Sequence, residues 1–204
     1  MPSVEDRFRA ALAGEIQALG LTLDEAAVER MVGHYGLLTQ WNRRMNLTRV
    51  AEPEEAARRH FGESLAFLAA ATDEWRSAVD VGSGAGFPGL ALAAACPDKQ
   101  VTLLEPVGKK AVFLREASRE WGNVRVRDVR AEMFRESADW VWMRAVSVAG
   151  ALGDLARIGR NVGLWVSEEG AEAARARAEW AWDESVELRG GESRFLVVGR
   201  RRST

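Results

Sequence analysis

The stretch of sequence that decides the fold reads Ala78-Val79-Asp80-Val81-Gly82-Ser83-Gly84-Ala85-Gly86-Phe87-Pro88-Gly89. An apolar run typical of a buried strand leads into a glycine-rich loop, and a helical pattern follows. Glycine adopts positive φ at no steric cost, so the loop can turn tightly and bring its backbone close to a ligand. In an open parallel sheet such a ligand lies beyond the carboxyl ends of the strands. We therefore expect a ligand-binding loop at Gly82 to Gly89 rather than a purely structural turn.

The spacing of the glycines bears on which ligand is bound. Residues 84–89 fit the dinucleotide pattern G-x-G-x-x-G, which alone is a weak signal. Glu105 ends the next expected strand, and its carboxylate could accept both ribose hydroxyls of an adenosine in either NAD or S-adenosyl-L-methionine. Asp80 closes the strand before the first glycine, and the register Asp80-x-Gly82-x-Gly84-x-Gly86 favours S-adenosyl-L-methionine. We expect this cofactor to be bound by Gly82, Gly84, Gly86 and Glu105.

Strand-like and helical segments alternate around this loop. Strands are expected at 77–81, 100–105, 124–128, 139–143 and 161–166, and helices at 88–95, 109–121, 147–157 and 169–180. This alternation is typical of a parallel sheet with helices on both faces. Two more strands, 184–188 and 194–199, are joined by a link too short for a helical crossover and should pair antiparallel. We predict an α/β, class I (Rossmann-like) methyltransferase fold with a mostly parallel seven-stranded sheet.

Residues 1–72 have helical periodicity and are predicted to form an N-terminal helical extension to a methyltransferase domain of residues 73–204. Gly20 is expected to end the first helix. Thr22 and Glu25 resemble a capping box for the second helix, and Pro53 is expected to open a third.

Composition limits the possible functions of the 204-residue chain. The net charge is -2 and the sequence pI is about 5.9, so an RNA contact would need a local basic patch. The single cysteine, Cys96, excludes an internal disulfide and a cysteine-rich zinc site, and no metal is expected. No apolar run approaches the length of a membrane span, and the N-terminus lacks a signal core. We expect a cytoplasmic monomer that does not bind membranes.

Four segments carry a more specific pattern than the glycines. They read Trp41-Asn42-Arg43-Arg44-Met45-Asn46-Leu47-Thr48, Arg59-His60-Phe61-Gly62-Glu63-Ser64-Leu65, the glycine loop continued through Leu104-Glu105-Pro106-Val107-Gly108-Lys109-Lys110-Ala111-Val112-Phe113-Leu114, and Arg144-Ala145-Val146-Ser147. In this order they resemble the bacterial 16S (small-subunit) ribosomal RNA guanine-N7 methyltransferases, also called the glucose-inhibited division protein B family. The resemblance covers nearly the whole chain. It implies methyl transfer from S-adenosyl-L-methionine to N7 of a guanine in small-subunit ribosomal RNA, either as free RNA or within a ribonucleoprotein.

The resemblance also implies roles for individual residues. Gly82 and Phe87 would contact the cofactor from the glycine loop, and Ala131 and Glu132 would lie beside the adenine. Arg144 is similar to the active-site arginine of the family and could hold the methionine carboxylate or a phosphate through its planar donor fork.

Two further arginines, Arg130 and Arg194, match residues that the family uses near the cofactor or the RNA. With Arg144 they are the predicted catalytic residues. N7 of guanine has an in-plane lone pair and no proton, so neither His34 nor His60 is needed as a base. Catalysis can depend on aligning nitrogen, methyl and sulfur at roughly 3 Å.

The sequence departs from the family at two places. Relatives usually carry a lysine-glycine pair where this chain reads Ser167-Glu168-Glu169-Gly170, and the usual aspartate of the second segment is Glu63. The loss of a cation disfavours phosphate binding. A divergent methyltransferase with another substrate, and a catalytically inactive cofactor-binding module, therefore stay open. Candidate phosphate contacts are Arg43, Arg44, Arg49, Arg58, Arg59 and Arg200-Arg201-Arg202.

Several conspicuous residues are interpreted as structural. His60 and Ser64, spaced i, i+4, are expected to form a hydrogen-bonded pair that fixes the extension. Asn42 and Asn46 are expected to cap or tie a turn. Most of the eight tryptophans are expected to pack in the core rather than stack on RNA bases.

Overall fold

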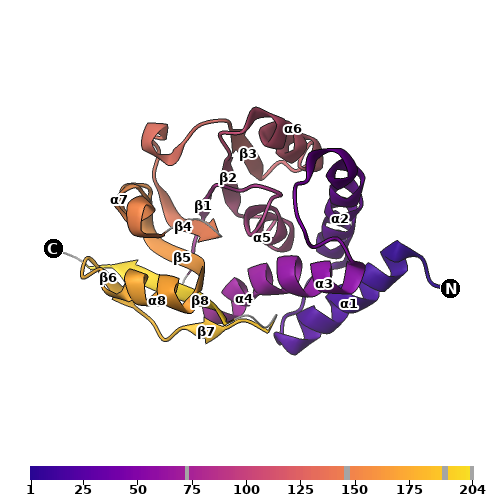
Figure 1. Ribbon diagram of the computed structural model, residues 1–204, viewed down its shortest axis with the longest axis horizontal. Helices are drawn as coiled ribbons and strands as arrows, with labels where there is room; N and C mark the ends of the chain where they lie inside the picture. Colours follow the sequence, from indigo (N-terminus) through magenta and orange to yellow (C-terminus); the bar gives the residue numbers. More distant parts are fainter. Residues whose placement is uncertain (72–73, 145–147, 190–192, 203–204) are drawn as a thin grey trace.

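A computed structural model of the protein describes residues 1–71, 74–144, 148–189 and 193–202. The domain boundary expected at residues 72 and 73, and Ala145 to Ser147 of the fourth segment, lie outside the described residues. Figure 1 shows the N-terminal helices at the right of the molecule, and α7, α8 and the C-terminal strands at the left.

The N-terminal region contains α1 (Val4–Ala18), α2 (Glu25–Met45), α3 (Pro53–Ala56), a π-helix (Ala57–Gly62) and α4 (Glu63–Ala70). The helix that begins at Pro53 confirms one sequence prediction. Gly20, with φ +67°, follows the end of α1 as expected. The predicted capping box at Thr22 was wrong, because the carboxylate of Asp24 accepts from the amide of Ala27 at 2.7 Å and caps α2 instead.

In the described part of the chain, eight strands form one sheet in the order β3-β2-β1-β4-β5-β8-β6, with β7 also paired to β8. The strands β1 to β5 are parallel to one another, and β8 is antiparallel to its neighbours. Their bounds are β1 Ser77–Val81, β2 Gln100–Leu104, β3 Val124–Arg127, β4 Ala138–Arg144, β5 Gly159–Ser167, β6 Trp180–Trp182, β7 Val186–Glu187 and β8 Arg194–Arg201. The mostly parallel α/β architecture is as predicted.

The predicted count of seven strands, and the helix expected over residues 169–180, need correction. The helix ends at Arg175, and Trp180–Trp182 forms an additional short strand against β8. Gly199 on β8 lies opposite Trp182, and a Cβ on Gly199 would come within 2.7 Å of the Trp182 ring. Cross-strand packing of the indole against this glycine therefore outweighs the helical pattern of the local sequence.

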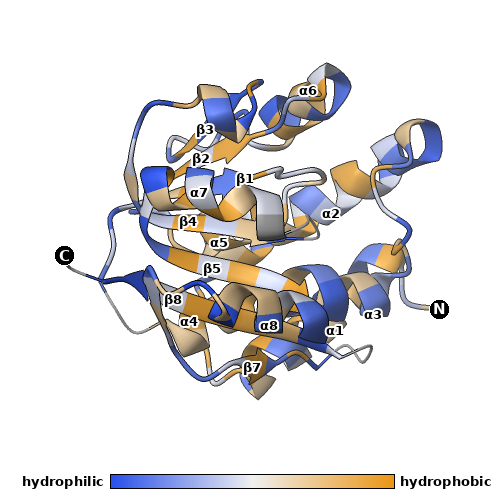
Figure 2. Ribbon diagram, turned by 60° about the vertical axis from the view of Figure 1, so that its left-hand side comes forward, coloured by the Kyte–Doolittle hydropathy of each residue, from blue (hydrophilic) through white to orange (hydrophobic). Residues whose placement is uncertain are grey.

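Two apolar clusters cover the two faces of the sheet. On β4, Trp140 and Trp142 face a cluster that includes the N-terminal helices and α5 (Gly89–Ala95), whereas Val141 and Met143 face α7 (Val148–Ile158) and α8 (Glu168–Arg175). Figure 2 shows the hydrophobic colour concentrated along β4, β5 and β8. The remaining elements are α6 (Gly108–Ala117) and a 3₁₀ turn, η2 (Ala131–Met133). Among the described helices, none is both long and apolar enough to cross a membrane.

Candidate functional site

The parallel register brings the ends of four strands to one edge of the sheet. Val81 pairs with Leu104 and Met143, and Leu104 pairs with Arg127. The segments that follow these strands therefore begin side by side. This carboxyl edge faces the viewer in Figure 1 and carries most of the residues that the sequence nominated.

The glycine loop has the backbone that its sequence predicts. Gly82, Gly84 and Gly86 have φ of 74°, 57° and 92°, which other residues rarely adopt. The amide of Gly82 donates to the carbonyl of Leu104 at 2.8 Å, so the loop is fastened to the end of β2. A Cβ on Gly84 would meet only the carbonyl of Gly82, at 3.7 Å, so the backbone at this glycine is open to a ligand.

Glu105 lies against this loop, as a ribose-binding carboxylate should. Its Oε2 accepts from the amide of Gly84 at 2.9 Å, and its Oε1 accepts from the amide of Val107 at 2.9 Å. An ionised carboxylate has about four acceptor positions, so one position remains on each oxygen. These two positions fit the two hydroxyls of a ribose. The donor and acceptor geometry is therefore suited to an adenosine cofactor.

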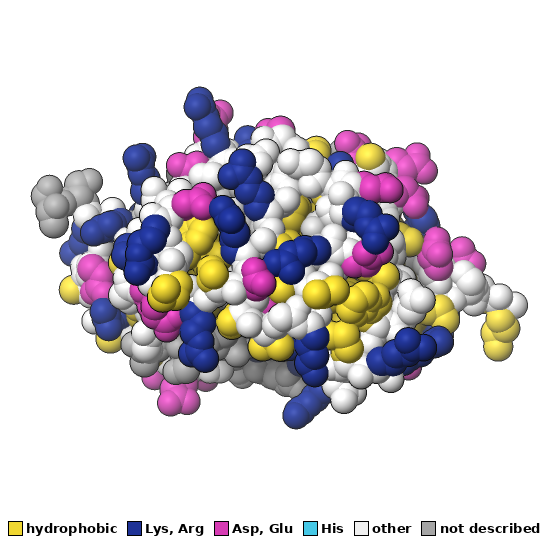
Figure 3. Space-filling model, turned by 90° about the horizontal axis from the view of Figure 1, so that it is seen from above, with side chains coloured by type: hydrophobic (Ala, Val, Ile, Leu, Met, Phe, Trp, Pro, Cys, Tyr) yellow, Lys and Arg dark blue, Asp and Glu magenta, His cyan; other side chains and the backbone are white. Residues whose placement is uncertain are grey.

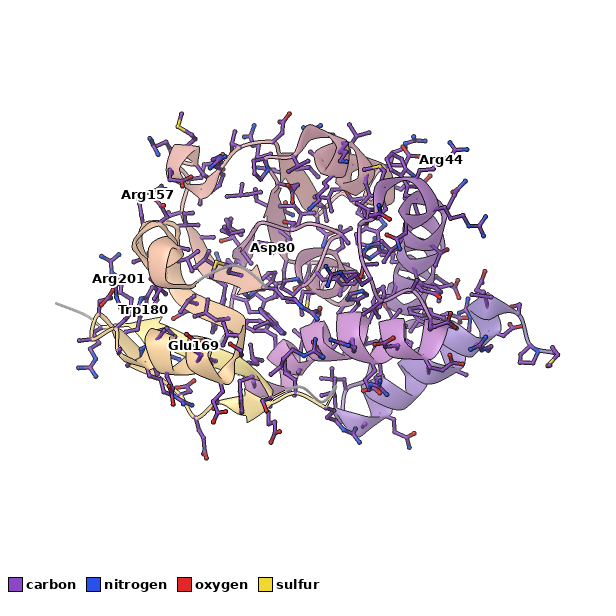
Figure 4. The ribbon with its side chains drawn as sticks, in the orientation of Figure 1. Arg44, Asp80, Arg157, Glu169, Trp180 and Arg201 are labelled. Carbon is purple, nitrogen blue, oxygen red and sulfur yellow. The ribbon has the colours of Figure 1, made fainter. Side chains whose placement is uncertain are left out.

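Asp80 is buried behind the loop, and its label lies at the centre of the molecule in Figure 4. Its Oδ2 accepts from the amide of Gly89 at 3.0 Å, whereas its Oδ1 has no hydrogen-bond partner among the described residues. Burial raises the pKa of Asp80 to about 7, against the opposing effect of its hydrogen bonds to Ser83 and Gly89. A Cβ on Gly89 would lie 2.6 Å from Oδ2, so only glycine allows the helix to begin this close.

The ring of Phe87 points into the N-terminal helices. It stacks on His34 with centroids 4.8 Å apart and on His60 with centroids 4.6 Å apart, and it meets the edge of Phe61. The ring is 7% exposed and fills a gap between the extension and the loop. A contact between Phe87 and a cofactor would therefore use its backbone, and the side chain positions the loop.

Of the two histidines in this stack, His34 is buried and His60 is partly buried. Nε2 of His34 lies 2.8 Å from the carbonyl of Ala85, and Nε2 of His60 lies 2.8 Å from the hydroxyl of Thr48. Burial lowers the pKa of His34 to about 4. Burial, with the nearby charge of Arg144, lowers the pKa of His60 to about 3.

These shifts predict how stability depends on pH. Between about pH 4 and 6.5 the unfolded chain binds more protons at His34 and His60, so acidification from pH 7 to 5 costs about 2 kcal/mol per histidine. Asp80 acts in the opposite sense, because the folded state holds its proton below pH 7 and gains about 2 kcal/mol over the same interval. We expect the wild type to lose about 1–2 kcal/mol, and Asp80→Asn to lose about 4 kcal/mol. Urea unfolding at pH 5 and 7 measures both, and equal losses would contradict the assignment.

The turn after β3 holds the residues expected beside the adenine. Ala131 and Glu132 belong to η2, and the exposed Arg130 precedes it. Arg157 on α7 donates to the carbonyl of Ala131 at 2.6 Å and also to that of Phe134, which fixes the turn (Figure 4). The turn therefore follows β3 on the cofactor side with its acidic side chain free to face solvent. The sequence analysis did not identify Arg157, which has no distinctive motif around it.

Two of the three predicted catalytic arginines meet at one carboxylate. Arg144 donates to Oε2 of Glu63 at 2.7 Å, and Arg194 donates to Oε1 of the same residue. Arg144 also donates to the carbonyls of Arg59, at 2.6 Å, and His60, at 3.4 Å. Arg130 lies apart from this group, in the turn after β3. Glu63 was noted in the sequence only as a departure from the family pattern, so its central place was missed.

The divergent segment after β5 has a clear structural role. The hydroxyl of Ser167 accepts from the amide of Gly170 at 3.3 Å and caps α8. Glu168 and Glu169 fill the first turn, where the positive end of the helix dipole favours carboxylates. Ser167 pairs with Arg194 across β5 and β8, so α8, which carries Glu169 (Figure 4), begins beside the strand residue Arg194.

The structure also tests the residues interpreted as structural. Asn42 ties the turn through hydrogen bonds of 2.9 Å to both backbone groups of Thr48, and Asn46 ends α2 with φ 49°, as expected. The predicted hydrogen bond between His60 and Ser64 is present, but it runs from the Ser64 hydroxyl to the backbone carbonyl of His60. The His60 ring is free of Ser64 and contacts the hydroxyl of Thr48.

Residues 27–191 match the family model described as "GidB: rRNA small subunit methyltransferase G". The chain belongs to this family. Membership in the GidB family confirms the resemblance inferred from the four segments. The chain is 40% identical over 139 residues to "Ribosomal RNA small subunit methyltransferase G" of Stenotrophomonas maltophilia (strain R551-3), a match that covers 67% of this chain and 64% of that protein.

A second relative aligns over a greater length. The protein of the same name from Methylobacillus flagellatus is 39% identical over 160 residues, which cover 76% of this chain and 77% of that protein. Among solved structures, the N-methyltransferase NodS from Bradyrhizobium japonicum WM9, in complex with S-adenosyl-L-homocysteine, superposes with a TM-score of 0.63 at 12% identity. This superposition covers 84% of the GidB-family chain and 100% of NodS, and it confirms the class I methyltransferase fold.

Proposed function

We propose that this protein transfers a methyl group from S-adenosyl-L-methionine to N7 of a guanine in small-subunit ribosomal RNA. The observation that carries the proposal is the pairing of Glu105 with the open glycine loop at the carboxyl edge of the sheet, in a chain of the GidB family. The cofactor supplies a methyl group activated by the sulfonium charge. A ribosomal substrate also assigns the reaction to the cytoplasm, in agreement with the sequence-based expectation.

The described residues fit this cofactor in three places. Glu105 has two acceptor positions for the ribose hydroxyls, and the backbone of Gly82 and Gly84 can approach the ligand closely. Ala131 and Glu132 follow β3, where they can contact the adenine. Arg144 lies at the end of β4 and can neutralise the methionine carboxylate or a substrate phosphate. We propose these residues as the cofactor site, with contacts from Phe87 limited to its backbone.

The chemistry of guanine N7 agrees with the protonation of the site. N7 attacks through an in-plane lone pair and loses no proton, so the enzyme needs to orient the base rather than deprotonate it. His34 is buried and His60 is partly buried, and both rings are occupied in packing Phe87. We therefore expect the protein to orient the base and to supply positive charge through Arg144 and Arg194. Arg130 would assist from the side of the adenine.

An RNA substrate needs basic residues beside the site, despite the net charge of -2. Figure 3 shows Lys and Arg side chains spread over the face seen from above, interleaved with hydrophobic side chains. Lys109 on α6, Arg127 at the end of the edge strand β3 and Arg130 after it are exposed next to the carboxyl edge. These residues supplement the arginines that the sequence analysis nominated, among which Arg44 is exposed near the end of α2 (Figure 4).

Mapping of ribosomal RNA tests the proposed function directly. We expect small-subunit RNA from a strain lacking the gene to have lost one 7-methylguanine, detected as the absence of a strand break after borohydride reduction and aniline cleavage. Purified protein and S-adenosyl-L-methionine should restore the break. Small subunits and protein-free RNA are compared as substrates. An unchanged cleavage pattern in the deletion strain would contradict the ribosomal substrate.

The second candidate is a methyltransferase with a different substrate, which the carboxylates of Glu168 and Glu169 favour. It predicts a thermal shift with S-adenosylhomocysteine but no change in ribosomal RNA after gene deletion. A cofactor-binding module without catalysis predicts the same shift and no methyl transfer to any RNA. NAD should give no shift in either case.

A further inference from the structure

Glu63 occupies an unusual position, where the π-helix Ala57–Gly62 passes into α4. Its side chain is only 2% exposed. The carboxylate accepts from Arg144 of β4 and from Arg194 of β8, and the backbone carbonyl accepts from Nε1 of Trp165 on β5 at 2.7 Å. One residue of the N-terminal extension therefore joins three strands at the carboxyl edge.

The charges around Glu63 are unequal. Burial raises the pKa of Glu63, and the guanidinium groups of Arg144, Arg194 and Arg59 act in the opposite direction. Arg59 pairs with Glu55 at 3.1 Å, so Arg144 and Arg194 are the two guanidinium groups that share the Glu63 carboxylate directly. Two cations on one carboxylate suit the binding of an anionic group of substrate or cofactor at the arginines rather than at Glu63.

Glu63 also competes with a second carboxylate for Arg144. Asp80 interacts with Arg144 electrostatically from the opposite side, beneath the glycine loop. The direct hydrogen bonds of the Arg144 guanidinium go to Glu63 and to the π-helix carbonyls of Arg59 and His60. Glu63 therefore determines the direction in which this guanidinium points.

We propose that Glu63 is a positioning residue that aims Arg144 and Arg194 at the reacting groups without touching the substrate itself. The inference rests on the proposed methyltransferase function and extends it to a residue outside the glycine loop.

The test uses the full-length protein with Glu63→Gln, Glu63→Asp and Arg144→Lys, and with the double variant Glu63→Gln/Arg144→Lys. Asp139→Asn is the matched control. Asp139 accepts from the amides of Arg76 and Ser77 at 2.8 Å and 3.0 Å, at the opposite end of the same strand as Arg144. Asp139→Asn converts a carboxylate to an amide, as Glu63→Gln does, but at the end of β4 away from the carboxyl edge of the sheet. Methyl transfer to small ribosomal subunits gives kcat and KM, and ¹⁵N spectra of the arginine side chains report whether the Arg144 guanidinium is ordered.

We expect Glu63→Gln to lower kcat/KM at least about 30-fold. The double variant should have a kcat/KM no more than about threefold below that of the less active single variant, because both changes act through one guanidinium. Glu63→Asp retains the charge but is shorter by one carbon, so it should recover part of the activity. If Glu63→Gln impairs folding, the Glu63→Asp variant still carries the comparison.

The proposal would be overturned if the loss of kcat/KM in the double variant equalled the product of the two single losses. It would also be overturned if folded Glu63→Gln had the kcat and KM of the wild type. A sharp Arg144 signal that survives in Glu63→Gln would also overturn it. Asp139→Asn should retain both the activity and the signal. If the wild type itself methylates no ribosomal RNA, the proposed function fails, and the Arg144 signal still decides whether Glu63 orders this residue.

Discussion

Arg144→Ala is expected to reduce methyl transfer at least about 100-fold and to lower the free energy of unfolding by about 3–5 kcal/mol. The variant removes one of the two guanidinium groups that neutralise Glu63, whose carboxylate is buried. It also removes the donor to the carbonyls of Arg59 and His60. Urea unfolding gives the stability, and single-turnover methylation of small subunits at saturating enzyme gives the rate.

Arg130→Ala is the control that separates stability from catalysis. Arg130 is exposed, so its replacement should change the free energy of unfolding by less than about 0.5 kcal/mol. A moderate loss of RNA or cofactor affinity without a loss of stability would support its proposed place on the adenine side. Full activity in a folded Arg144→Ala protein would refute the assignment of Arg144 to the active site.

Phe87→Ala is expected to destabilise the protein by about 3–5 kcal/mol and to weaken binding of S-adenosylhomocysteine about tenfold. The ring fills the space between His34 and His60, and its loss would leave a cavity between the extension and the glycine loop. The loop would then adopt its binding conformation less often, which lowers the apparent affinity. Calorimetric titration at a temperature where the variant remains folded measures the effect.

Phe67→Ala provides the matched comparison for this second prediction. Phe67 is fully buried in the same apolar cluster but packs on Trp140 and Trp142 rather than on the loop. We expect a similar loss of stability with unchanged affinity for S-adenosylhomocysteine. Equal losses of affinity in both variants would show that general destabilisation, rather than the position of Phe87, controls cofactor binding.

Much of the site could be predicted because it depends on local backbone chemistry. Three glycines at alternate positions require positive φ, and the structure gives them that conformation. Glu105 was placed correctly because adjacent parallel strands end at the same edge, so a residue after β2 must lie near the loop after β1. Neither inference needed knowledge of distant contacts.

The errors arose where distant contacts decide the structure. Trp180–Trp182 has a helical pattern, but it pairs with β8 because Gly199 leaves room for an indole. His60 and Ser64 are hydrogen-bonded as their spacing suggests, but the bond uses the His60 carbonyl, and the His60 ring contacts Thr48 instead. In both cases the energy of packing against residues far along the chain exceeds the small local preference.

The amino-acid sequence by itself determined the sheet class, the cofactor loop and the family, because alternating segments, glycine spacing and motif order are properties of neighbouring residues. Only the tertiary structure decided that Phe87 belongs to the packing of the extension and that Glu63 unites Arg144 with Arg194. These residues are more than 20 positions apart along the chain, and an ion pair or a stacked ring depends on distance in space. Folding alone brings such groups within the few ångströms at which they interact.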